Sequence, residues 1–374
     1  MSDLVSDVVV VGAGMAGASV AAELASRVSV VLVEAEYSPA VHSTGRSAAA
    51  FLPSYGGAVV RALTAASRSL YDARSVEYGT ELLRSRPLIW VATDPESLRA
   101  LAHAAKADRE LVQLTSAETV AWCPALRADR IIEGALDSAA MDIDVAGLHG
   151  TYLGEFKRRN GNLLLDAPVR HVERTGREWR VTAGTQVISC GQVVNAAGAW
   201  ADEVAKLAGV PTLGLQPKVR SAFVSPTAFS GEISDWPMIF DILERWYFKP
   251  EATLILGSPA DETDTAPGDA RPDELAVARA LESINDITTL GLRSVRRAWA
   301  GLRSFVADRA PVVGSWAGHE GFHFVAGQGG YGIQMAPALA AIAADAVLEG
   351  ELSARTAAYG ATLDALGPGR LGRA

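Results

Sequence analysis

The chain has 374 residues, 49% of them hydrophobic and 21% charged, which is ordinary for a globular protein and long enough for two domains. Its formal net charge of −9 argues against nucleic acid as a partner. Because the two cysteines, Cys123 and Cys190, and the six histidines form neither a disulfide framework nor a metal-ligand pattern, we expect a reduced, cytoplasmic protein without a bound metal.

The N-terminal segment has the pattern of a strand, a glycine turn, a helix and a second strand. Residues 8–11 form a continuous β-branched run, which is typical of a strand buried on both faces. The run stops at Gly12 and has no basic segment before it, so we expect neither a signal peptide nor a membrane span. A small-residue helix is predicted over 14–26 and a strand over 28–33.

The turn after the first strand fits the dinucleotide-binding pattern GxGxxG at Gly12, Gly14 and Gly17. In this pattern the first glycine makes a tight turn, the second lets the backbone approach a pyrophosphate, and the third lets the helix pack closely on the strand. The free N–H groups at the helix start then attract phosphate charge. Glu34 ends the second strand, where a carboxylate can bind the hydroxyls of an adenosine ribose.

Strand-like and helix-like patterns continue along the rest of the chain. Strands are predicted over residues 87–92, 192–195, 221–224, 246–249 and 253–256. Helical patterns are found over 96–108, from 141 to 156, over 200–208 and over 275–283. We interpret the acidic stretch 261–274 as a surface loop, and we expect the glycine-rich turn 327–332 to lead into a helix that reaches Gly350.

Five motifs occur in order along the chain: GAGMAGAS, VEAE, HSTGRSAA, NAAGAWADE and GQGGYGIQ. The third carries hydroxyls, a glycine and an arginine, which suit a diphosphate as well as an ordinary polar loop. Together the motifs resemble the D-amino acid oxidase superfamily of flavoproteins, and most closely its branch of D-arginine dehydrogenase and glycine-oxidase-like enzymes. The resemblance covers almost the whole chain.

The resemblance implies an α/β fold of the glutathione-reductase type, with a Rossmann-type FAD-binding domain and a second, mixed antiparallel-sheet substrate domain. The FAD-binding domain would comprise residues 1–84, 141–217 and 300–374. The substrate domain would comprise residues 85–140 and 218–299.

The resemblance also implies FAD in an extended form. We expect it to be non-covalent, because no cysteine follows Cys190 in the region where some relatives tether the flavin. Residues 329–334 would begin a helix whose N-terminus stabilises negative charge on the flavin. The cofactor-binding residues implied are Gly12, Gly14, Met15, Ala16, Gly17, Glu34, Ala35, Ser43, Thr44, Arg46, Ser47, Ala48, Val169, Ala196, Ala197, Gly198, Trp200, Gly329, Gly330, Tyr331, Gly332, Ile333 and Gln334.

On the substrate side, the resemblance implies that Arg303 binds a carboxylate through its planar guanidinium. Arg220 and Tyr247 would lie beside that carboxylate. The carbonyl of Gly330 would accept a hydrogen bond from the substrate amine. Tyr55 would cover the site from a mobile loop.

Two positions depart from D-arginine dehydrogenase. Its guanidinium-binding glutamate is replaced by Leu88, and a pocket histidine is replaced by Ala50, next to Phe51. A buried leucine leaves a cationic side chain without a partner, which is costly. We therefore expect a pocket for apolar side chains, with Leu52 and Trp246 nearby.

These residues predict an FAD-dependent enzyme that oxidises the CH–NH bond of an apolar amino acid-type substrate. The substrate is either an apolar D-amino acid or an N-substituted glycine cleaved to glyoxylate and a free amine. Oxygen or a quinone or other carrier would accept the electrons, and no lysine stands at residues 254–256, where some relatives activate oxygen. The alternative from another class is a non-catalytic FAD-binding subunit of a larger flavoprotein complex.

Overall fold

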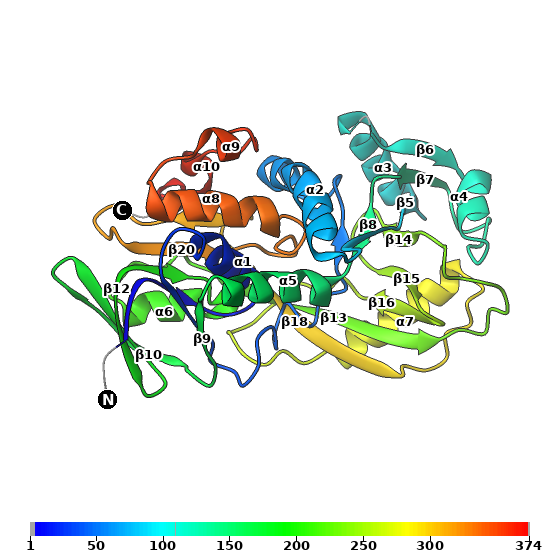
Figure 1. The fold of residues 1–374 in the computed structure, drawn as a ribbon. Helices are drawn as coiled ribbons and strands as arrows, with labels where there is room; N and C mark the ends of the chain where they lie inside the picture. Colours follow the sequence, from blue (N-terminus) through cyan, green and yellow to red (C-terminus); the bar gives the residue numbers. More distant parts are fainter. Residues whose placement is uncertain (1–3, 109, 373–374) are drawn as a thin grey trace.

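The computed structural model describes residues 4–108 and 110–372, which form two lobes built on separate sheets (Figure 1). The first lobe contains an eight-stranded sheet with the order β10-β11-β12-β1-β2-β9, in which β20 also pairs with β12, and β19 with β20. Its strands are β1 (Leu4–Val11), β2 (Val30–Val33), β9 (Asn162–Leu164), β10 (Val169–Thr175), β11 (Glu178–Ala183), β12 (Gln186–Asn195), β19 (Val312–Gly314) and β20 (Phe322–Ala326). The predicted fold class is confirmed by this mixed α/β architecture.

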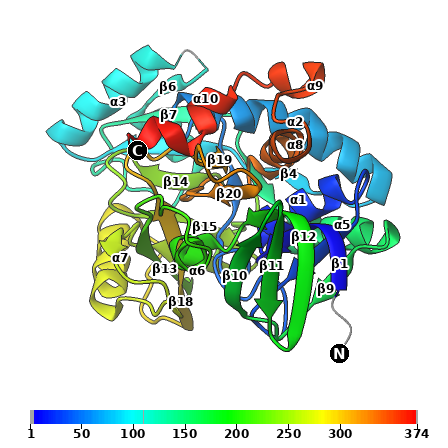
Figure 2. The ribbon, with the colours of Figure 1, turned by 90° about the vertical axis from the view of Figure 1, so that its left-hand side faces the viewer.

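Both faces of the first sheet are buried, as the β-branched run at its centre predicts. Val8 and Val10 pack in the cluster that contains residues of α1, α5 and α8, whereas Val9 and Val11 pack in the cluster that contains residues of α6. Figure 2 shows α1 and α5 on one side of the sheet and α6 on the other. The helices and short helical turns of this lobe are α1 (Met15–Leu24), α2 (Ala58–Tyr78), α5 (Val145–Arg158), η1 (Gly198–Trp200), α6 (Ala201–Leu207), α8 (Ala336–Leu348), α9 (Ala354–Ala357), α10 (Leu363–Leu366) and η2 (Pro368–Leu371).

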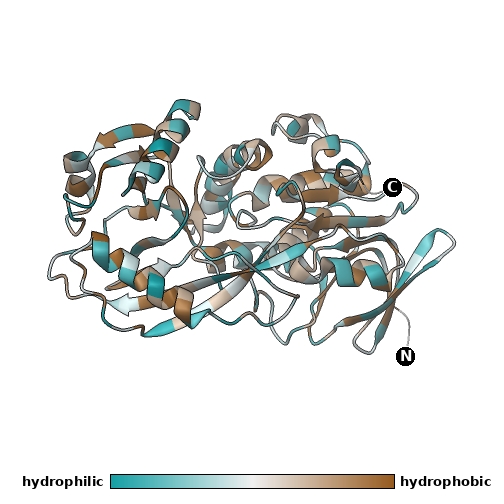
Figure 3. Cartoon of the chain, turned by 180° about the vertical axis from the view of Figure 1, so that it is seen from behind, coloured by the Kyte–Doolittle hydropathy of each residue, from teal (hydrophilic) through white to brown (hydrophobic). Residues whose placement is uncertain are grey.

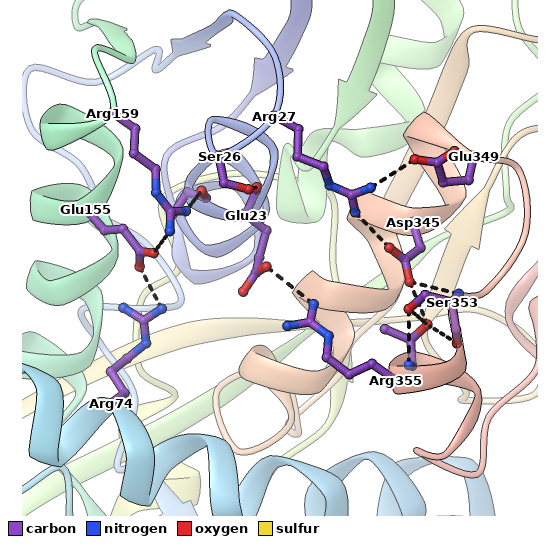
Figure 4. A network of polar contacts seen from close by, with 12 residues as sticks. Glu23, Ser26, Arg27, Arg74, Glu155, Arg159, Asp345, Glu349, Ser353 and Arg355 are labelled. Carbon is purple, nitrogen blue, oxygen red and sulfur yellow. Dashed lines mark hydrogen bonds and ion pairs between the residues drawn. The ribbon is translucent and has the colours of Figure 1, made fainter.

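Ion pairs join the helices that cover the first sheet (Figure 4). Arg27, just after α1, lies 2.8 Å from Asp345 of α8, while Arg74 of α2 lies 2.7 Å from Glu155 of α5. Arg159 reaches the other oxygen of Glu155 at 2.6 Å. The Arg74–Glu155 pair is largely buried, so each charge satisfies the other where water is excluded, and the pair links α2 to α5.

The second lobe is a nine-stranded, mostly antiparallel sheet with the order β17-β13-β16-β15-β14-β5-β7-β6, and β18 pairs with β13. Its strands are β5 (Leu88–Ala92), β6 (Val112–Thr115), β7 (Glu133–Asp137), β13 (Gln216–Pro226), β14 (Met238–Asp241), β15 (Tyr247–Glu251), β16 (Leu254–Ser258), β17 (Thr263–Asp264) and β18 (Arg297–Phe305). Its helices are α3 (Pro95–Ala107), α4 (Ser116–Trp122) and α7 (Glu274–Ile287). A three-stranded sheet, β3 (Ala50–Phe51), β8 (Met141–Ile143) and β4 (Leu83–Ser85), lies beside the lobes with the order β3-β8-β4.

The outer helix α7 has one apolar face toward the sheet and one polar face. In Figure 3 the outer helix α7 shows teal and brown bands along its length. Its buried residues, Val277, Ala280, Ile284 and Ile287, recur every three or four positions and so share one face. None of the helices in the described part of the chain has both the length and the apolar character needed to cross a bilayer.

Three local predictions need correction. Residues 141–143 form strand β8 rather than the start of a helix, because they pair with β3 and β4. The helix expected from residue 329 begins at Ala336 in α8, because Gly329 has a left-handed φ of +53° and residues 330–335 form turns. The stretch 261–274 is more than a surface loop, because β17 within it pairs with β13.

The limits between the FAD-binding and substrate domains stay a prediction, but the strand assignments in the two large sheets suggest moving some of them. The limit at residues 140/141 falls between β7 and β8, which belong to different sheets, whereas the limit at 84/85 falls within β4. Those at 217/218 and 299/300 fall within β13 and β18. Because both strands belong to the nine-stranded sheet, we propose that they lie wholly in the substrate domain.

Candidate active site

The carboxyl ends of the central parallel strands meet at one edge of the first sheet. Val11, the last residue of β1, is in register with Val33 of β2 and with Asn195 of β12. The predicted motifs at residues 12–17, 34–36 and 196–200 follow these three ends directly. This edge is where open α/β sheets bind their ligands.

The glycine turn has the close contacts that its spacing predicts. Gly12 has a φ of +98°, and a Cβ there would lie 2.6 Å from the carbonyl oxygen of Ala196. A Cβ on Gly17 would lie 1.7 Å from the carbonyl oxygen of Gly12, so only glycine lets α1 pack this closely on β1. At Gly14 the nearest atom would be the Thr44 hydroxyl at 3.3 Å, which leaves the turn open on the cavity side.

Side chains from three other segments hold the glycine turn. The carboxylate of Glu34 accepts a hydrogen bond from the backbone N–H of Ala13 at 2.7 Å. The Thr44 hydroxyl accepts one from the N–H of Met15 at 3.0 Å, at the start of α1. The Nε2 of His149, on α5, lies 2.9 Å from the carbonyl oxygen of Ala13.

His149 was missed in the sequence, where nothing marks it apart from its place in an amphipathic helix. Its side chain is buried, and burial lowers the pKa of its imidazole. A neutral imidazole whose Nε2 carries the proton donates to the Ala13 carbonyl. His149 therefore braces the turn without adding charge to it.

Two adjoining cavities run from this turn toward the second lobe. A cavity of about 410 Å³ lies at the edge of the first sheet, and one of about 170 Å³ lies between the lobes. Residues of the turn and of the segments after β2 and β12 line both: Gly14, Ser43, Thr44, Ala196, Gly198 and Ala199. The two cavities meet at the glycine turn, and one is lined by Glu34 and the other by Arg303, an arrangement that fits FAD in an extended form.

Most of the predicted cofactor residues line this space. Around the larger cavity are Gly12, Gly14, Glu34, Ala35, Ser43, Thr44, Val169, Ala196, Ala197, Gly198 and Trp200. Around the smaller are Met15, Ala16, Arg46, Ser47, Ala48, Gly329, Gly330, Gly332 and Ile333. Lining residues that the sequence did not single out include Glu36, His42, Glu203 and Gln328.

Some predicted residues have other contacts. The guanidinium of Arg46 bonds to the carbonyls of Val41, Ala270 and Ala300 and to Asp269 at 2.6 Å, so it ties the two lobes together. The carboxamide of Gln334 is buried between the N–H of Leu52 and the hydroxyl of Thr64. Both side chains are thus satisfied by protein groups, and their predicted role toward the cofactor stays a prediction.

Gln328 supplies a polar group for a bound ligand. Its Nε2 is buried and has no hydrogen-bond partner among the described residues. A Cβ on Gly332 would lie 2.5 Å from its Oε1, so the carboxamide is held against the turn before α8. An unsatisfied buried donor costs about 1–3 kcal/mol, which an acceptor atom of FAD would offset. This donor and the glycine cradle make the residues fit the cofactor.

Arg303 lies at the substrate end of the space. It is partly buried on β18, and a Cβ on Gly330 would lie 2.6 Å from its Nη1, so a larger residue at position 330 would have to displace the guanidinium. Burial on its own lowers the pKa of Arg303, but the hydroxyls of Tyr55 and Tyr247 favour the charged form, and the pKa is raised overall. Within the described residues Arg303 has no carboxylate partner.

Arg220 lines the same cavity from β13 and is 7% exposed. Its Nη2 lies 3.0 Å from Glu262, whereas its Nε and Nη1 have no partner in the described part of the chain. Burial and the charge of Arg303 lower the pKa of Arg220. The structure thus brings the two predicted arginines together.

Tyr55 and Tyr247 belong to a group of aromatic rings beside the arginines. The ring of Tyr55 lies 5.2 Å from that of Tyr331, and the ring of Tyr247 lies 4.8 Å from that of Phe240. Burial raises the pKa of the Tyr55 hydroxyl, which donates to Glu244 at 2.7 Å. Phe240 was missed in the sequence, because no local pattern indicates which face of its strand meets the site.

The predicted apolar residues separate into two groups. Leu88, Leu52 and Ala50 pack in the cluster that contains Tyr247, but none of them is among the residues that line the two cavities. Phe51 points the other way, into the core of the first lobe, where its ring lies 5.8 Å from that of Tyr71. Trp246, expected near the pocket, directly precedes β15 and packs in a different cluster from Tyr247, because neighbouring residues of an extended chain point to opposite sides.

The sequence profile of the DAO family, FAD dependent oxidoreductases, matches residues 7–346. The chain belongs to this family. The predicted superfamily, the oxidoreductase class and the dependence on FAD are confirmed by this match.

The chain is also similar to individual proteins, one in sequence and two in structure. FAD-dependent oxidoreductase domain-containing protein 1 of Bos taurus is 31% identical over 185 residues, which are 44% of this chain and 37% of that protein. The match thus spans little more than a third of the relative. An L-proline dehydrogenase from P. horikoshii has a TM-score of 0.83 at 20% identity, covering 100% of this chain and 99% of the other. A glycine oxidase from Geobacillus kaustophilus has a TM-score of 0.81 at 19% identity, covering 94% and 96%. These two structures show the shared fold.

Proposed function

We propose that this family member oxidises the CH–NH bond of an apolar amino acid-type substrate. The observation that carries the proposal is the guanidinium of Arg303, which faces the cavity without a carboxylate partner among the described residues. A substrate carboxylate is the natural partner for such a planar, charged fork. The same fold in a glycine oxidase supports a substrate of this chemical class.

The proposed residues position the substrate rather than react with it. Arg303 binds the carboxylate, with Arg220 and Tyr247 beside it, and the carbonyl of Gly330 accepts a hydrogen bond from the neutral amine. When bound, FAD supplies the hydride acceptor. The substrate imine then hydrolyses in water. No nucleophile is needed, since orientation at the anchor supplies most of the catalysis.

Two substrate classes fit this proposal. In an apolar D-amino acid, the side chain would contact the cluster of Leu88, Leu52 and Ala50. In an N-substituted glycine, the N-substituent would lie there, and the products would be glyoxylate and a free amine. The proposed electron acceptor is oxygen or a quinone or other carrier, and the proposed location is the cytoplasm.

An anaerobic screen for flavin bleaching tests the proposed function. The protein would be mixed with D-amino acids and with N-carboxymethyl amines of matched side chains, and oxygen would be admitted afterwards. We expect bleaching by one class of apolar substrate. If no carboxylate-bearing amine bleached the flavin, the non-catalytic FAD-binding subunit would become the better interpretation.

We also propose that FAD is bound without a covalent link. Cys123 and Cys190 are buried, burial raises the pKa of both thiols to about 12, and neither lines the two cavities. Acid precipitation is expected to release all the yellow colour into the supernatant. Colour that stays with the pellet would contradict this expectation.

A further inference from the structure

The substrate end of the cavity holds more positive charge than one carboxylate requires. Arg220 and Arg303 line the same small space, and the charge of Arg303 acts on Arg220. Two guanidiniums side by side in a buried site repel each other, and a nearby anion offsets the energy of this repulsion. Before a substrate binds, Arg220 therefore needs an anion supplied by the protein.

Glu262 provides that anion from the segment just before β17. Its Oε1 lies 3.0 Å from Nη2 of Arg220 and 2.9 Å from Nη2 of Arg309, and its Oε2 lies 3.1 Å from Nη1 of Arg309. The Arg309 side chain is 44% exposed, so solvent screens its charge, whereas Arg220 is buried. Of the two guanidiniums that Glu262 contacts, Arg220 is therefore the one whose charge solvent does not screen.

The neighbouring residue fixes Glu262 in this position. Asp261 accepts hydrogen bonds from the backbone N–H of Ser221 at 2.6 Å and from its hydroxyl at 2.8 Å. Ser221 directly follows Arg220 on β13, so the two acids are held against the strand that carries the arginine. On the other side, the Arg309 guanidinium lies 3.8 Å from the centre of the Phe305 ring, which steadies the second partner of Glu262.

We propose that Glu262 determines how many carboxylates the site accepts. By pairing with Arg220 it leaves Arg303, among the described residues, as the guanidinium that faces the cavity without a hydrogen-bonded carboxylate, which adapts the site to substrates with a single carboxylate. Without the charge of Glu262, the positive charge of Arg220 has no paired carboxylate, and its Nε and Nη1, which have no partner among the described residues, offer donors to a second carboxylate. This inference rests on the proposed carboxylate anchor at Arg303.

A matched pair of anions tests the inference. Propionate and succinate differ by one carboxylate, and each would be titrated into the FAD-loaded protein at constant ionic strength, with the flavin absorbance as the readout. Glu262→Gln keeps the size of the side chain and removes its charge. We expect this variant to raise the affinity for succinate relative to propionate by about tenfold. Adding Arg220→Met to Glu262→Gln is expected to abolish the gain.

Asp264→Asn is the matched control. Asp264 lies on the same segment and pairs with Lys218, but its side chain is 64% exposed, so this variant removes the same charge outside the arginine cluster. We expect an unchanged succinate-to-propionate ratio. An equal gain in Asp264→Asn would mean that only the overall charge matters, and the inference would be overturned.

Other outcomes separate this inference from the proposed function. If Glu262→Gln did not fold, Glu262→Asp, which shortens the carboxylate's reach, should still raise the ratio by a smaller factor. If the succinate-to-propionate ratio were unchanged in folded Glu262→Gln, the inferred role of Glu262 would be overturned. If Arg303→Leu then no longer bound propionate, the proposed carboxylate anchor at Arg303 would still stand. If neither anion perturbed the wild-type flavin, the anchor itself would be rejected.

Discussion

The nucleotide end of the cavity is formed largely by backbone and small residues, and its substrate end is formed by large side chains. At the nucleotide end, Gly12, Gly14 and Gly17 lie within six positions of one another and make their contacts through the main chain. At the substrate end, Arg220, Tyr247 and Arg303 come from three strands that are far apart in the sequence. The first end depends on the absence of Cβ atoms, and the second depends on charge and ring packing.

This difference determines what each end tolerates. A close backbone contact leaves no room for any added atom, so a single methyl group should disrupt the nucleotide end. A charged anchor can be replaced by an apolar side chain of similar size while the fold persists, so changes at the substrate end should alter catalysis more than stability. The following predictions test this contrast.

The largest effect is expected at Gly17. In Gly17→Ala the new Cβ would lie 1.7 Å from the carbonyl oxygen of Gly12, so α1 would have to move away from β1. We expect a loss of more than about 3 kcal/mol in the free energy of unfolding and a protein purified without FAD. Gly57→Ala is the control, because a Cβ there meets no atom within 4 Å. Denaturant unfolding and the flavin absorbance measure both, and a Gly17→Ala protein with normal FAD content would refute the argument.

Arg303→Leu should affect catalysis rather than stability or FAD content, in contrast to Gly17→Ala. We expect the variant to retain FAD and its stability but to lose about 3–5 kcal/mol in catalytic efficiency, because the substrate carboxylate loses a partly buried partner. Arg297→Leu, at the exposed start of the same strand, should leave kcat/KM nearly unchanged. Steady-state kinetics on a substrate found in the bleaching screen would measure the effect. Near-normal efficiency of Arg303→Leu would place the anchor elsewhere.

A pH effect should arise in the first lobe. His323 on β20 is buried with its Nε2 3.0 Å from Oε1 of Gln192, and burial lowers the pKa of its imidazole to about 4. Below the ordinary histidine pKa of about 6.5 the unfolded chain binds a proton that the folded chain does not. The free energy of unfolding should therefore fall as the pH decreases from about 6.5 to about 4, by up to about 3 kcal/mol.

His323→Gln should remove most of this dependence, and His103→Gln, at an exposed position on α3, should not. Urea unfolding between pH 4.5 and 7.5 would compare the three proteins. The same slope in the wild type and in His323→Gln would show that another group causes the acid sensitivity.

The smallest effect is expected for specificity at Leu88. Leu88→Glu should raise the catalytic efficiency for D-arginine relative to D-leucine or an alkyl-substituted glycine by no more than about tenfold. The gain is modest because the side chain is fully buried beside apolar residues, where a carboxyl group tends to stay protonated. Leu88→Gln is the uncharged control. A wild-type preference for D-arginine would show that Leu88 does not contact the substrate.

The sequence alone was enough for the nucleotide end and for the class of fold. The GxGxxG spacing predicts a tight turn and a close helix, and both occur; the contact of Gly17 with Gly12 is local, whereas that of Gly12 with Ala196 comes from the neighbouring strand. The β-branched run at residues 8–11 likewise predicted a strand covered on both faces. Local geometry of this kind needs no knowledge of the rest of the chain.

The tertiary structure decided which side chains face one another at the substrate end. It turns Phe51 toward Tyr71 and away from Leu88, and it places Trp246 behind the strand that presents Tyr247. It also brings Glu262, from a stretch that looked like a surface loop, to Arg220 across 42 positions of sequence. Such pairings depend on strand register and on the packing of whole sheets, because a shift of one residue reverses the face on which every side chain of a strand lies.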